Sequence, residues 1–496
     1  MESQTQDPKN EKIVENKELN IWEALIPIFA LVGMLAYNVY VFGDEALSGS
    51  NQFILLMGAA VAAIVGHFNK VSFDLMVEEV SQNVKSTTGA ILILLMVGAL
   101  AGTWMVSGII PTMIYYGLQI LNPTIFLAAC VVICAIISIA TGSSWTTSAT
   151  VGIALIGIAN ALGISLGMTA GAVLSGAYFG DKLSPLSDTT NLAPAMAGTD
   201  LFTHIRYMLY TTVPTIVITL LVFIIIGFTL EPSGEADTAT ILGSINEAFT
   251  ISPWLFLVPL IVIGLIIKKT SPLIALLIGT LLGALAALIF QPDIVATLGG
   301  GNTLSFENGY KGIMNAITVD SSIATDNESL NDLFTSSGMA GMLGTIWLII
   351  CAMVFGGIMD AIGALATISK ALLNLFHTTF GLFASTVASC LALNVTASDQ
   401  YLAIVVPGKM YAKAFKDKGL APENLSRTLE DSGTVTSVLV PWNTCGAYQS
   451  GVLGVNVSDY FVYAIFNWLS PFMTLIFAAF SIKIRQLSTA STTEKK

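Results

Sequence analysis

Residues 143–191 read SSWTTSATVGIALIGIANALGISLGMTAGAVLSGAYFGDKLSPLSDTTN, and they contain the most informative pattern in the chain. Two polar clusters, TGSSWTTS at 141–148 and GDKLSPLSDTTN at 180–191, interrupt segments that are otherwise apolar enough for lipid. Polar and helix-breaking residues at membrane depth are costly, and they persist mainly where they line a binding site or an ion path. The pattern therefore favours a membrane transporter.

The composition of the whole chain is that of a polytopic membrane protein. Of its 496 residues, 54% are hydrophobic and only 10% are charged, whereas a soluble domain carries about 25% charged residues. We predict an all-α membrane unit between a polar N-terminal tail at 1–20 and a second tail at 486–496. The first tail lacks the basic start and apolar run of a signal peptide, and we expect both tails to be cytoplasmic.

The composition also argues against several other classes of function. The five cysteines lie in apolar segments without a CxxC pair, and the three histidines are scattered, so neither a zinc site nor a cofactor is expected. The chain lacks a GxxxxGK[ST] phosphate loop and cannot hydrolyse ATP by that route. With a net charge of -12, nucleic acid is not an expected partner either. We expect transport driven by an ion gradient, and no enzymatic activity.

The charges of the loops predict the topology. Basic loops at 70–85, 268–269 and 409–427 mark the cytoplasmic side, and acidic stretches at 231–247 and 293–332 mark the outside. About ten transmembrane helices are predicted, at 22–42, 53–66, 89–117, 168–198, 206–230, 253–267, 271–290, 338–370, 429–456 and 459–482. A full span needs about 20 residues. The segment 380–408, bounded by basic residues at both ends, is therefore too short for two spans and is predicted to be a re-entrant hairpin.

The two halves of the chain show the same order of polar interruptions. Ser144 and Ser398 are 254 positions apart, and so are Thr190 and Thr444. Counterpart segments run in opposite directions through the predicted topology, which indicates two inverted repeats. The predicted boundaries are 21–230 and 253–485 for the repeats, 231–252 for an extracellular linker, 141–147 and 394–400 for the hairpin tips, and 168–198 and 429–456 for the broken helices.

The polar interruptions supply the groups that a desolvated monovalent cation needs. Such an ion binds several oxygens near a negative charge, and unwound backbone together with Ser, Thr, Asn and Asp side chains provides them. Pro185 and Pro441 weaken the helices where carbonyls must be freed. The predicted Na+ or substrate site consists of Ser143, Ser144, Thr146, Asp188, Thr189, Thr190, Asn191, Asn394, Thr396, Ser398, Asp399, Asn443 and Thr444.

A buried carboxylate that holds either a proton or a cation would couple the movements of the two ions. Asp188 is the first candidate for this role and Asp399 is the second. Asp360 is a third candidate, because it lies inside a long apolar run. Asp181 is a fourth, with pairing to the adjacent Lys182 or capping of a helix as its alternative roles.

The remaining charged residues are expected outside the site. Glu430 and Asp431 are expected close to the cytoplasmic surface, where they would be solvated or in salt bridges. No Arg or Lys is expected inside the core segments. The absence of a buried base favours a cation over an isolated organic dicarboxylate, whose charges would be left unpaired.

Three stretches resemble the NhaC family of bacterial Na+/H+ antiporters: GSSWTTSATVG at 142–152, GDKLSPLSDTTNLAPAMAGTDLFTHIRYML at 180–209 and PWNTCGAY at 441–448. The resemblance implies two inverted repeats, each with a hairpin and a broken helix, and Na+/H+ exchange by alternating access at the bacterial plasma membrane. One branch of the family resembles malate/lactate exchangers coupled to Na+ and H+, so transport of a small organic anion or an amino acid stays open as the alternative. The expected partners are Na+, H+ and the lipid bilayer, and a homodimer is left open.

Overall fold

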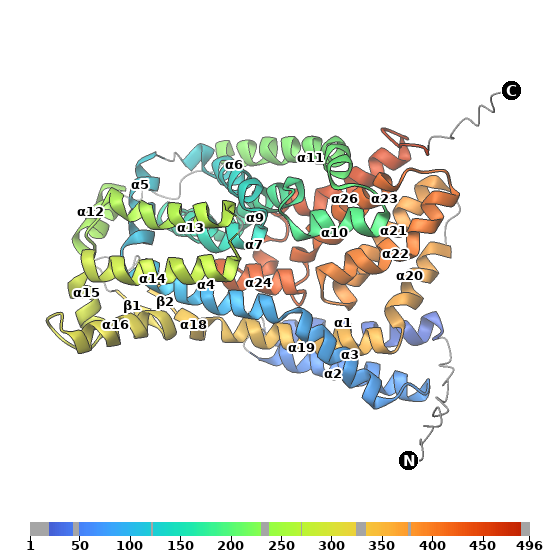
Figure 1. The fold of residues 1–496 in the computed structure, drawn as a ribbon, viewed down its shortest axis with the longest axis horizontal. Helices are drawn as coiled ribbons and strands as arrows, with labels where there is room; N and C mark the ends of the chain where they lie inside the picture. The colour runs from blue at the N-terminus through green and yellow to red at the C-terminus, as the bar shows by residue number, and fades with distance from the viewer. Residues whose placement is uncertain are drawn as a thin grey trace, which may run out of the picture.

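The computed structural model describes residues 19–42, 49–120, 123–229, 238–268, 270–323, 334–374 and 378–487. Figure 1 shows that helices make up nearly all of the described chain and run mostly side by side. The one sheet within these ranges has two short strands, in which β1 (Ser321–Ser322) pairs antiparallel with β2 (Thr335–Ser336). The predicted all-α class is confirmed.

Eight helices of the described chain are long and apolar enough to cross a membrane. They are α1 (Ile21–Phe42), α2 (Ser50–Phe68), α4 (Thr88–Val106), α6 (Pro123–Thr141), α11 (Leu201–Thr229), α14 (Pro272–Phe290), α21 (Thr379–Thr396), and α18 (Gly338–Gly341) taken together with α19 (Leu343–Ala361). A ninth span results if α12 (Thr238–Ala248) is joined to η3 (Pro253–Phe256) and α13 (Leu257–Ile267), which are bent by 84° relative to it. About 20 apolar residues cross the hydrocarbon core, so the chain is a multi-pass membrane protein.

Two predicted crossings are each divided into two helices. The segment 89–117, predicted to be one crossing, is not one continuous helix, because α4 ends at Val106 and α5 (Ile109–Ile120) begins after Gly108. The segment 338–370 is likewise divided, since α19 ends before Gly363 and α20 (Ala364–Asn374) begins after it. Gly108 has φ +80° and Gly363 has φ +74°. Glycine reaches this left-handed region without a steric penalty, and such a residue commonly ends a helix.

The helices of the two halves recur at a constant separation. α6 begins 256 positions before α21, and α9 (Leu166–Leu183) begins 256 positions before α23 (Pro422–Leu429). α10 (Asp188–Ala197) matches α24 (Thr444–Leu453) at both ends with the same separation. The continuous helix α22 (Gln400–Asp417) matches three consecutive elements of the first half, α7 (Ser144–Thr147), η2 (Ser148–Gly152) and α8 (Ile153–Ala161). α11 matches α25 (Val457–Tyr460) followed by α26 (Ile465–Ala479). Two short helices, η5 (Glu430–Thr434) and η6 (Ser437–Leu439), continue α23.

Left-handed backbone conformations mark the same repeat. Gly142 has φ +72° and Ser398 has φ +58°, and these two turn residues are 256 positions apart. Two glycine pairs with positive φ, 163 with 419 and 198 with 454, show the same separation. The predicted pairing of Ser144 with Ser398 is therefore wrong by two positions, because it aligned the first residue of α7 with the turn residue before α22.

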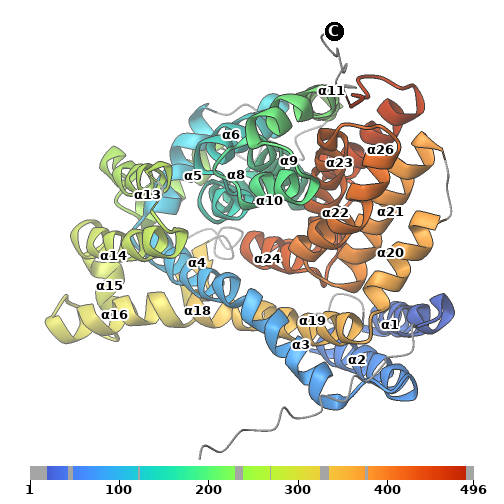
Figure 2. The ribbon, with the colours of Figure 1, turned by 45° about the vertical axis from the view of Figure 1, so that its right-hand side comes forward.

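The matched helices pack into one group, and the other helices lie beside it. α9 packs on α6 and α26, and α10 packs on α22 and α23. In Figure 2 this group lies at the top and right, while α3, α4, α14, α16, α18 and α19 follow its lower left side. The helices not yet delimited are α3 (Phe73–Ser86), α15 (Pro292–Leu298) and α16 (Phe306–Thr318).

Glycines allow α9 to approach α6 closely. A Cβ added at Gly176 would lie 2.2 Å from the backbone oxygen of Val131, and one at Gly180 would lie 2.6 Å from that of Ala135. Such short distances exclude any side chain and are typical of tightly packed membrane helices. The C-terminal turn of α9, which carries Asp181, is therefore held firmly against α6.

Candidate functional site

A cavity of about 560 Å³ lies where the two hairpin tips meet the break between α9 and α10. Its wall combines residues from both halves of the chain. The polar residues that the tips and the breaks contribute to it are Thr141, Ser143, Thr146, Asp181, Ser187, Asp188, Thr189, Asp399, Gln400, Tyr401 and Thr444. Ile93 of α4 and Pro272 of α14 lie on the wall as well.

Four helices begin at this cavity, and each is capped by a side chain. The capping residues are Ser143 on α7, Ser187 on α10, Asp399 on α22 and Asn443 on α24. Asp399 Oδ1 accepts the backbone N–H of Leu402 at 3.0 Å. Asn443 Oδ1 accepts that of Cys445, also at 3.0 Å. Each cap satisfies a backbone donor that the helix leaves free, so the interruptions in the sequence are helix starts.

Asp181 is held in place by the first hairpin tip. Its Oδ2 accepts a hydrogen bond from Ser144 Oγ at 2.7 Å and another from the Ser144 backbone N–H at 3.2 Å. Asp181 is only 9% exposed. Two donors on one oxygen tie the end of α9 to the hairpin tip, and they fix the orientation in which the carboxylate lines the cavity.

Asp188 is exposed, which corrects the expectation that it is the buried carboxylate. It is the first residue of α10 and lines the cavity, but the break before α10 leaves its side chain open to solvent. Asp399 is 5% exposed, so Asp399 and Asp181 are the buried carboxylates of the cavity. An exposed carboxylate keeps most of its hydration, and it attracts cations more than it binds a dehydrated one.

The described lining of the cavity is acidic. It includes the carboxylates of Asp181, Asp188 and Asp399, and none of the described residues that line it is Lys, Arg or His. Carboxylate and hydroxyl oxygens are the ligands that hard cations prefer. An anion would meet three negative groups in this wall without a basic residue to offset them. The wall therefore suits a cation.

Two predicted ligands of the first half hold the break in shape and do not line the cavity. Thr190 Oγ1 donates to the backbone oxygen of Asp181 at 3.0 Å. Asn191 Nδ2 donates to the backbone oxygen of Pro185 at 2.9 Å. These bonds satisfy carbonyls that the end of α9 and the loop would otherwise leave free.

The second half uses its predicted residues in a similar way. Asn394 Nδ2 donates to the backbone oxygen of Gly433 at 2.8 Å, and Asn443 Nδ2 donates to that of Asn394 at 3.0 Å. Thr396 and Ser398 are buried, and neither hydroxyl has a hydrogen-bond partner among the described residues. None of these four predicted ligands is on the cavity wall; the predicted Thr444 is.

Asp360 is not brought together with the other predicted carboxylates. It lies on α19 and lines a second cavity of about 580 Å³, together with Val71, Lys370 and Met410. The first cavity contains no contribution from α19 in the described chain. The four proton-coupling candidates therefore divide into a group of three and the separate Asp360.

Four charged residues are fully buried where sequence analysis did not expect it. Lys182, Arg427, Glu430 and Asp431 are all 0% exposed. Their burial contradicts the expectation that Glu430 and Asp431 lie near the surface, although Asp431 does form the salt bridge expected as an alternative to solvation. The expectation that the core contains no base is wrong. Lys182 Nζ forms an ion pair with Asp431 Oδ1, and Thr474 Oγ1 donates to the other carboxylate oxygen.

These buried charges were missed because their partners are distant in the sequence. Lys182 and Asp431 are separated by 249 positions. Arg427 was counted with the basic loop at 409–427, yet its guanidinium lies 4.5 Å from the centre of the Tyr207 ring. The available signal was the adjacent pair Asp181 and Lys182 within an otherwise apolar helix.

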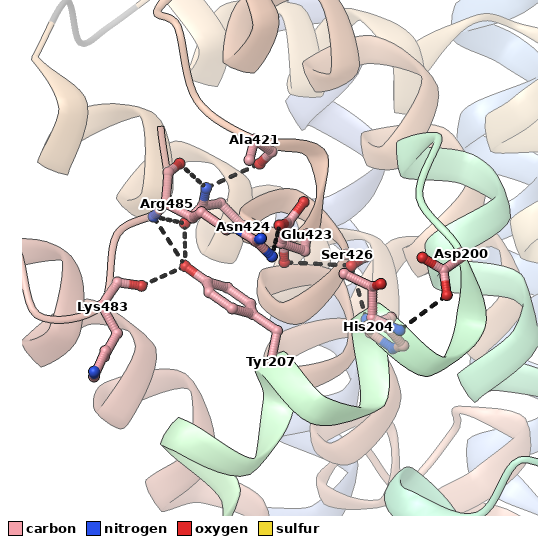
Figure 3. Close-up of polar contacts among 10 residues, drawn as sticks. Asp200, His204, Tyr207, Ala421, Glu423, Asn424, Ser426, Lys483 and Arg485 are labelled. Atoms are coloured by element: carbon pink, nitrogen blue, oxygen red, sulfur yellow. Dashed lines mark hydrogen bonds and ion pairs between the residues drawn. The ribbon is translucent and has the colours of Figure 1, made fainter. Parts of the chain in front are cut away.

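A second polar network joins α11 and α23 to the end of the described chain (Figure 3). The Tyr207 hydroxyl donates to Asn424 Oδ1 at 2.5 Å, and Asn424 Nδ2 donates to the backbone oxygen of Arg485 at 2.7 Å. His204 Nδ1 lies 2.7 Å from Ser426 Oγ. His204 is fully buried. The network fixes the position of α23, and therefore of the buried charges that follow it.

An aromatic pair joins the two halves beside the cavity. The rings of Trp145 and Tyr448 are stacked, with centroids 3.9 Å apart and planes 19° apart. The Tyr448 hydroxyl donates to the backbone oxygen of Trp145 at 3.2 Å. Because Trp145 also lies on the cavity wall, this pair connects α7 and α24 directly at the site.

Comparison with known proteins identifies the family. Residues 176–482 match the Na+/H+ antiporter family. The chain is 37% identical over 430 residues to the Na+/H+ antiporter NhaC of Alkalihalophilus pseudofirmus, a match that covers 87% of this chain and 90% of that protein. It is 36% identical over 435 residues to the malate-2H+/Na+-lactate antiporter of Bacillus subtilis, which covers 87% and 88% respectively. It is 32% identical over 465 residues to the arginine/ornithine antiporter ArcD of Halobacterium salinarum, which covers 93% and 92%. The chain therefore belongs to the Na+/H+ antiporter family, as its resemblance to the NhaC proteins predicted, and it is a membrane transporter and not an enzyme.

Proposed function

We propose that this protein exchanges Na+ for H+ across the plasma membrane by alternating access, and that the cavity at the hairpin tips is its ion site. The observation that carries the proposal is the cavity wall, which has three carboxylates and no basic side chain among its described residues. The proposed ligands are Ser143, Thr146, Asp181, Thr189, Asp399 and Thr444, and the exposed Asp188 is proposed to attract the ion to them. Ser144, Thr190, Asn191, Asn394 and Asn443 are proposed to hold the tips and breaks in position through their hydrogen bonds. Ser398 is proposed to do so through its left-handed turn, and Thr396 is buried without a side-chain partner in the described chain.

Exchange follows from competition for the buried negative charge. Asp181 and Asp399 are nearly inaccessible to bulk water. A desolvated carboxylate favours its protonated form, and a bound cation favours its ionised form. In this proposal, Na+ enters only as a proton leaves, and the reverse occurs on the other side of the membrane.

We further propose the inverted arrangement of the repeats at 21–230 and 253–485, with ten crossings, two re-entrant hairpins and cytoplasmic termini. The support is the constant separation of the matched helices, together with opposite orientations assigned by the loop charges. In this arrangement the proposed ion site lies at the interface of the two repeats.

The cavity is proposed to open toward the cytoplasm in this conformation. Thr87 and Ser271 lie on its wall, and each is within three positions of a lysine that the loop-charge rule assigns to the cytoplasm, Lys85 and Lys268. The stacked pair at Trp145 would then lie toward the outer side of the site. Outward opening would require these two rings to separate.

A cationic amino acid is the second candidate solute, and the size of the cavity favours it. A volume of about 560 Å³ is far larger than one ion requires, and the acidic wall suits an ammonium or guanidinium group. The relative from Halobacterium salinarum is named an arginine/ornithine antiporter. Malate or lactate fits this wall less well, because either anion would need Na+ bound beside it to offset the carboxylates.

Reconstitution into liposomes separates these functions. Proton flux should be measured after addition of Na+ alone, and then with arginine, malate or lactate present. We expect Na+ alone to move protons, Asp181→Asn to move none, and the control variant Glu307→Gln to behave as wild type, because Glu307 lies in an exposed pair with Lys311. Proton flux that begins only when an organic solute is supplied would replace Na+/H+ exchange by the second candidate.

A further inference from the structure

The cluster of buried charges beside the cavity contains a carboxyl group, that of Glu430, which forms no ion pair in the described chain; the hydroxyl of Thr434 is its polar neighbour, without hydrogen-bond geometry. Glu430 is 0% exposed, and neither of its carboxylate oxygens has a hydrogen-bond partner in the described chain. Asp431, the next residue, differs in this respect because Lys182 and Thr474 occupy both of its oxygens. A buried ionised carboxylate without partners is costly. Glu430 is therefore suited to carry a removable proton.

The backbone at Glu430 is unusual as well. The residue begins η5, a π-helical segment that interrupts the helical run after α23. π-helical segments of this length are rare, and they occur frequently at functional sites. The equivalent position 256 residues earlier is Leu174, inside the regular helix α9. The carboxyl group and the π-helix thus occur in only one of the two matched segments.

The charges of the cluster do not balance when every group is ionised. Lys182 and Arg427 supply two positive charges, and both are fully buried. Asp181, Glu430 and Asp431 supply three negative charges, and Glu430 is within electrostatic range of Lys182 and of the other two carboxylates. One negative charge is therefore in excess. Because excess charge inside a membrane protein is costly, the cluster favours the uptake of one monovalent cation.

The structure separates the two places where that cation can bind. Asp181 lines the cavity, where a metal ion can reach it. Glu430 is not on the cavity wall, and only a proton is small enough for a buried carboxyl group without a solvent-filled space beside it. Na+ at Asp181 and a proton on Glu430 would each neutralise the same excess charge. Binding of one would weaken binding of the other.

The other groups that face the cluster do not provide an equivalent proton site. α11 contributes His204 and Tyr207. Tyr207 donates to Asn424, and His204 Nδ1 lies beside Ser426, while His204 Nε2 has no hydrogen-bond partner in the described chain. His204 differs from Glu430 because its protonation adds a positive charge to the cluster and does not remove a negative one. α21 and α22 pack on η5 and contain the buried Cys390 and Tyr411, the latter bonded to Ser389. α22 is also capped by the buried Asp399, which lines the cavity and accepts the Leu402 backbone N–H, so that a cation can reach it as it can reach Asp181. α26 contributes the neutral Thr474, and the one charged residue of α10 is the exposed Asp188. α23 contributes Arg427, which remains charged at all relevant pH values.

We propose that Glu430 carries the proton of the exchange cycle, while Na+ binds in the cavity at Asp181. The step is balanced: Na+ binds to the protein with protonated Glu430, one proton leaves, and the product has bound Na+ and ionised Glu430. This inference rests on the proposed Na+/H+ exchange, and it assigns the proton to a residue outside the ion cavity.

The test is Na+ binding to the purified full-length protein, measured by calorimetry between pH 6 and pH 9. Buffers with different heats of ionisation give the number of protons released for each Na+ bound. For wild type we expect the release of about one proton, and an affinity that weakens on acidification by about tenfold to a hundredfold, a usual range for coupling between two sites. Glu430→Gln should bind Na+ at every pH with the weak affinity that wild type has at pH 6, and should release no proton.

Two further variants make the result specific. Glu423→Gln changes a second buried glutamate, which lies on α23 and is paired with Arg485 at 2.7 Å, and it should keep the pH dependence of wild type. Glu430→Asp keeps a titratable group at the site and should keep proton release, with a shifted midpoint. This shift also provides the test if the Gln variant does not fold.

The outcomes distinguish the inference from the function on which it rests. Proton release of wild-type size in Glu430→Gln, or an unshifted midpoint in Glu430→Asp, would overturn the assignment of the proton to Glu430. The cavity carboxylates would then carry it, and Na+/H+ exchange would stand. If wild type binds no Na+ at any pH, the proposed function itself fails.

Discussion

Replacing Asp431 by asparagine should leave the ammonium group of Lys182 buried without its counter-ion. Both side chains are 0% exposed, and Thr474 completes the hydrogen bonding of the carboxylate. Removing one partner of a buried pair costs about 3–5 kcal/mol, because the remaining charge cannot return to water. We therefore expect Asp431→Asn to lower the free energy of unfolding by about that amount, measured by equilibrium denaturation of the detergent-solubilised protein.

A double variant shows whether this loss comes from the unpaired charge. Lys182→Met combined with Asp431→Leu removes both charges and keeps most of the side-chain volume, and such replacements are often neutral within about 1–2 kcal/mol. The two substitutions should therefore be strongly non-additive. The control is Glu307→Gln, which breaks the exposed pair with Lys311 and should leave stability unchanged. A loss below about 1 kcal/mol in Asp431→Asn, or losses that simply add in the double variant, would refute the argument.

Three further predictions concern the cavity, the helix packing and the topology. Asp181→Asn should abolish sodium-driven proton flux, whereas Asp360→Asn, in the other cavity, should retain it. Because Asp188 is exposed, Asp188→Asn should raise the Na+ concentration for half-maximal flux without lowering the maximum. Equal losses in all three variants would contradict the assignment of the ion site to Asp181. Gly176→Ala should destabilise the protein by about 1–3 kcal/mol, because the added Cβ would contact the Val131 backbone. Gly243→Ala should not, because a Cβ added there has no atom within 4 Å. Thermal denaturation compares the two variants, and equal stabilities would contradict the prediction. Asn302→Cys should react with an impermeant thiol reagent from outside and Lys413→Cys only from inside, against a background of five buried native cysteines; labelling of both from one side would exclude the proposed topology.

The regular part of the fold was accessible from the sequence because it depends on local patterns. Apolar segments identified the membrane class, and clusters of Ser, Thr, Asn and Asp lie at the starts of the capped helices around the cavity. The separation of the halves was estimated as 254 and is 256. The estimate relied on side-chain similarity at Ser398, whereas the alignment is set by the left-handed turn residues Gly142 and Ser398.

The chemistry of the site was less accessible because burial depends on residues distant in the sequence. Asp181 and Asp188 lie seven positions apart in one polar cluster, yet the break between α9 and α10 buries the first and exposes the second. Lys182 is stable in the core only because Asp431, 249 positions away, lies against it. Arg427 belongs to a basic stretch in the sequence, and α23 places it over Tyr207. Local patterns predicted Asp399 and part of the cavity's hydroxyls, those of Ser143, Thr146, Thr189 and Thr444, but not Ser187, the buried bases or Glu430.

The most direct test of Na+/H+ exchange is the accumulation of radioactive sodium in proteoliposomes that contain only this protein. Vesicles should be loaded at acid pH and diluted into alkaline medium with trace Na+ and without any organic solute. The acidic cavity predicts that Na+ accumulates inside against its gradient, that dissipating the pH gradient releases it, and that Asp181→Asn abolishes it. No accumulation by the folded wild-type protein, with rapid uptake once arginine, malate or lactate is added, would contradict the proposal.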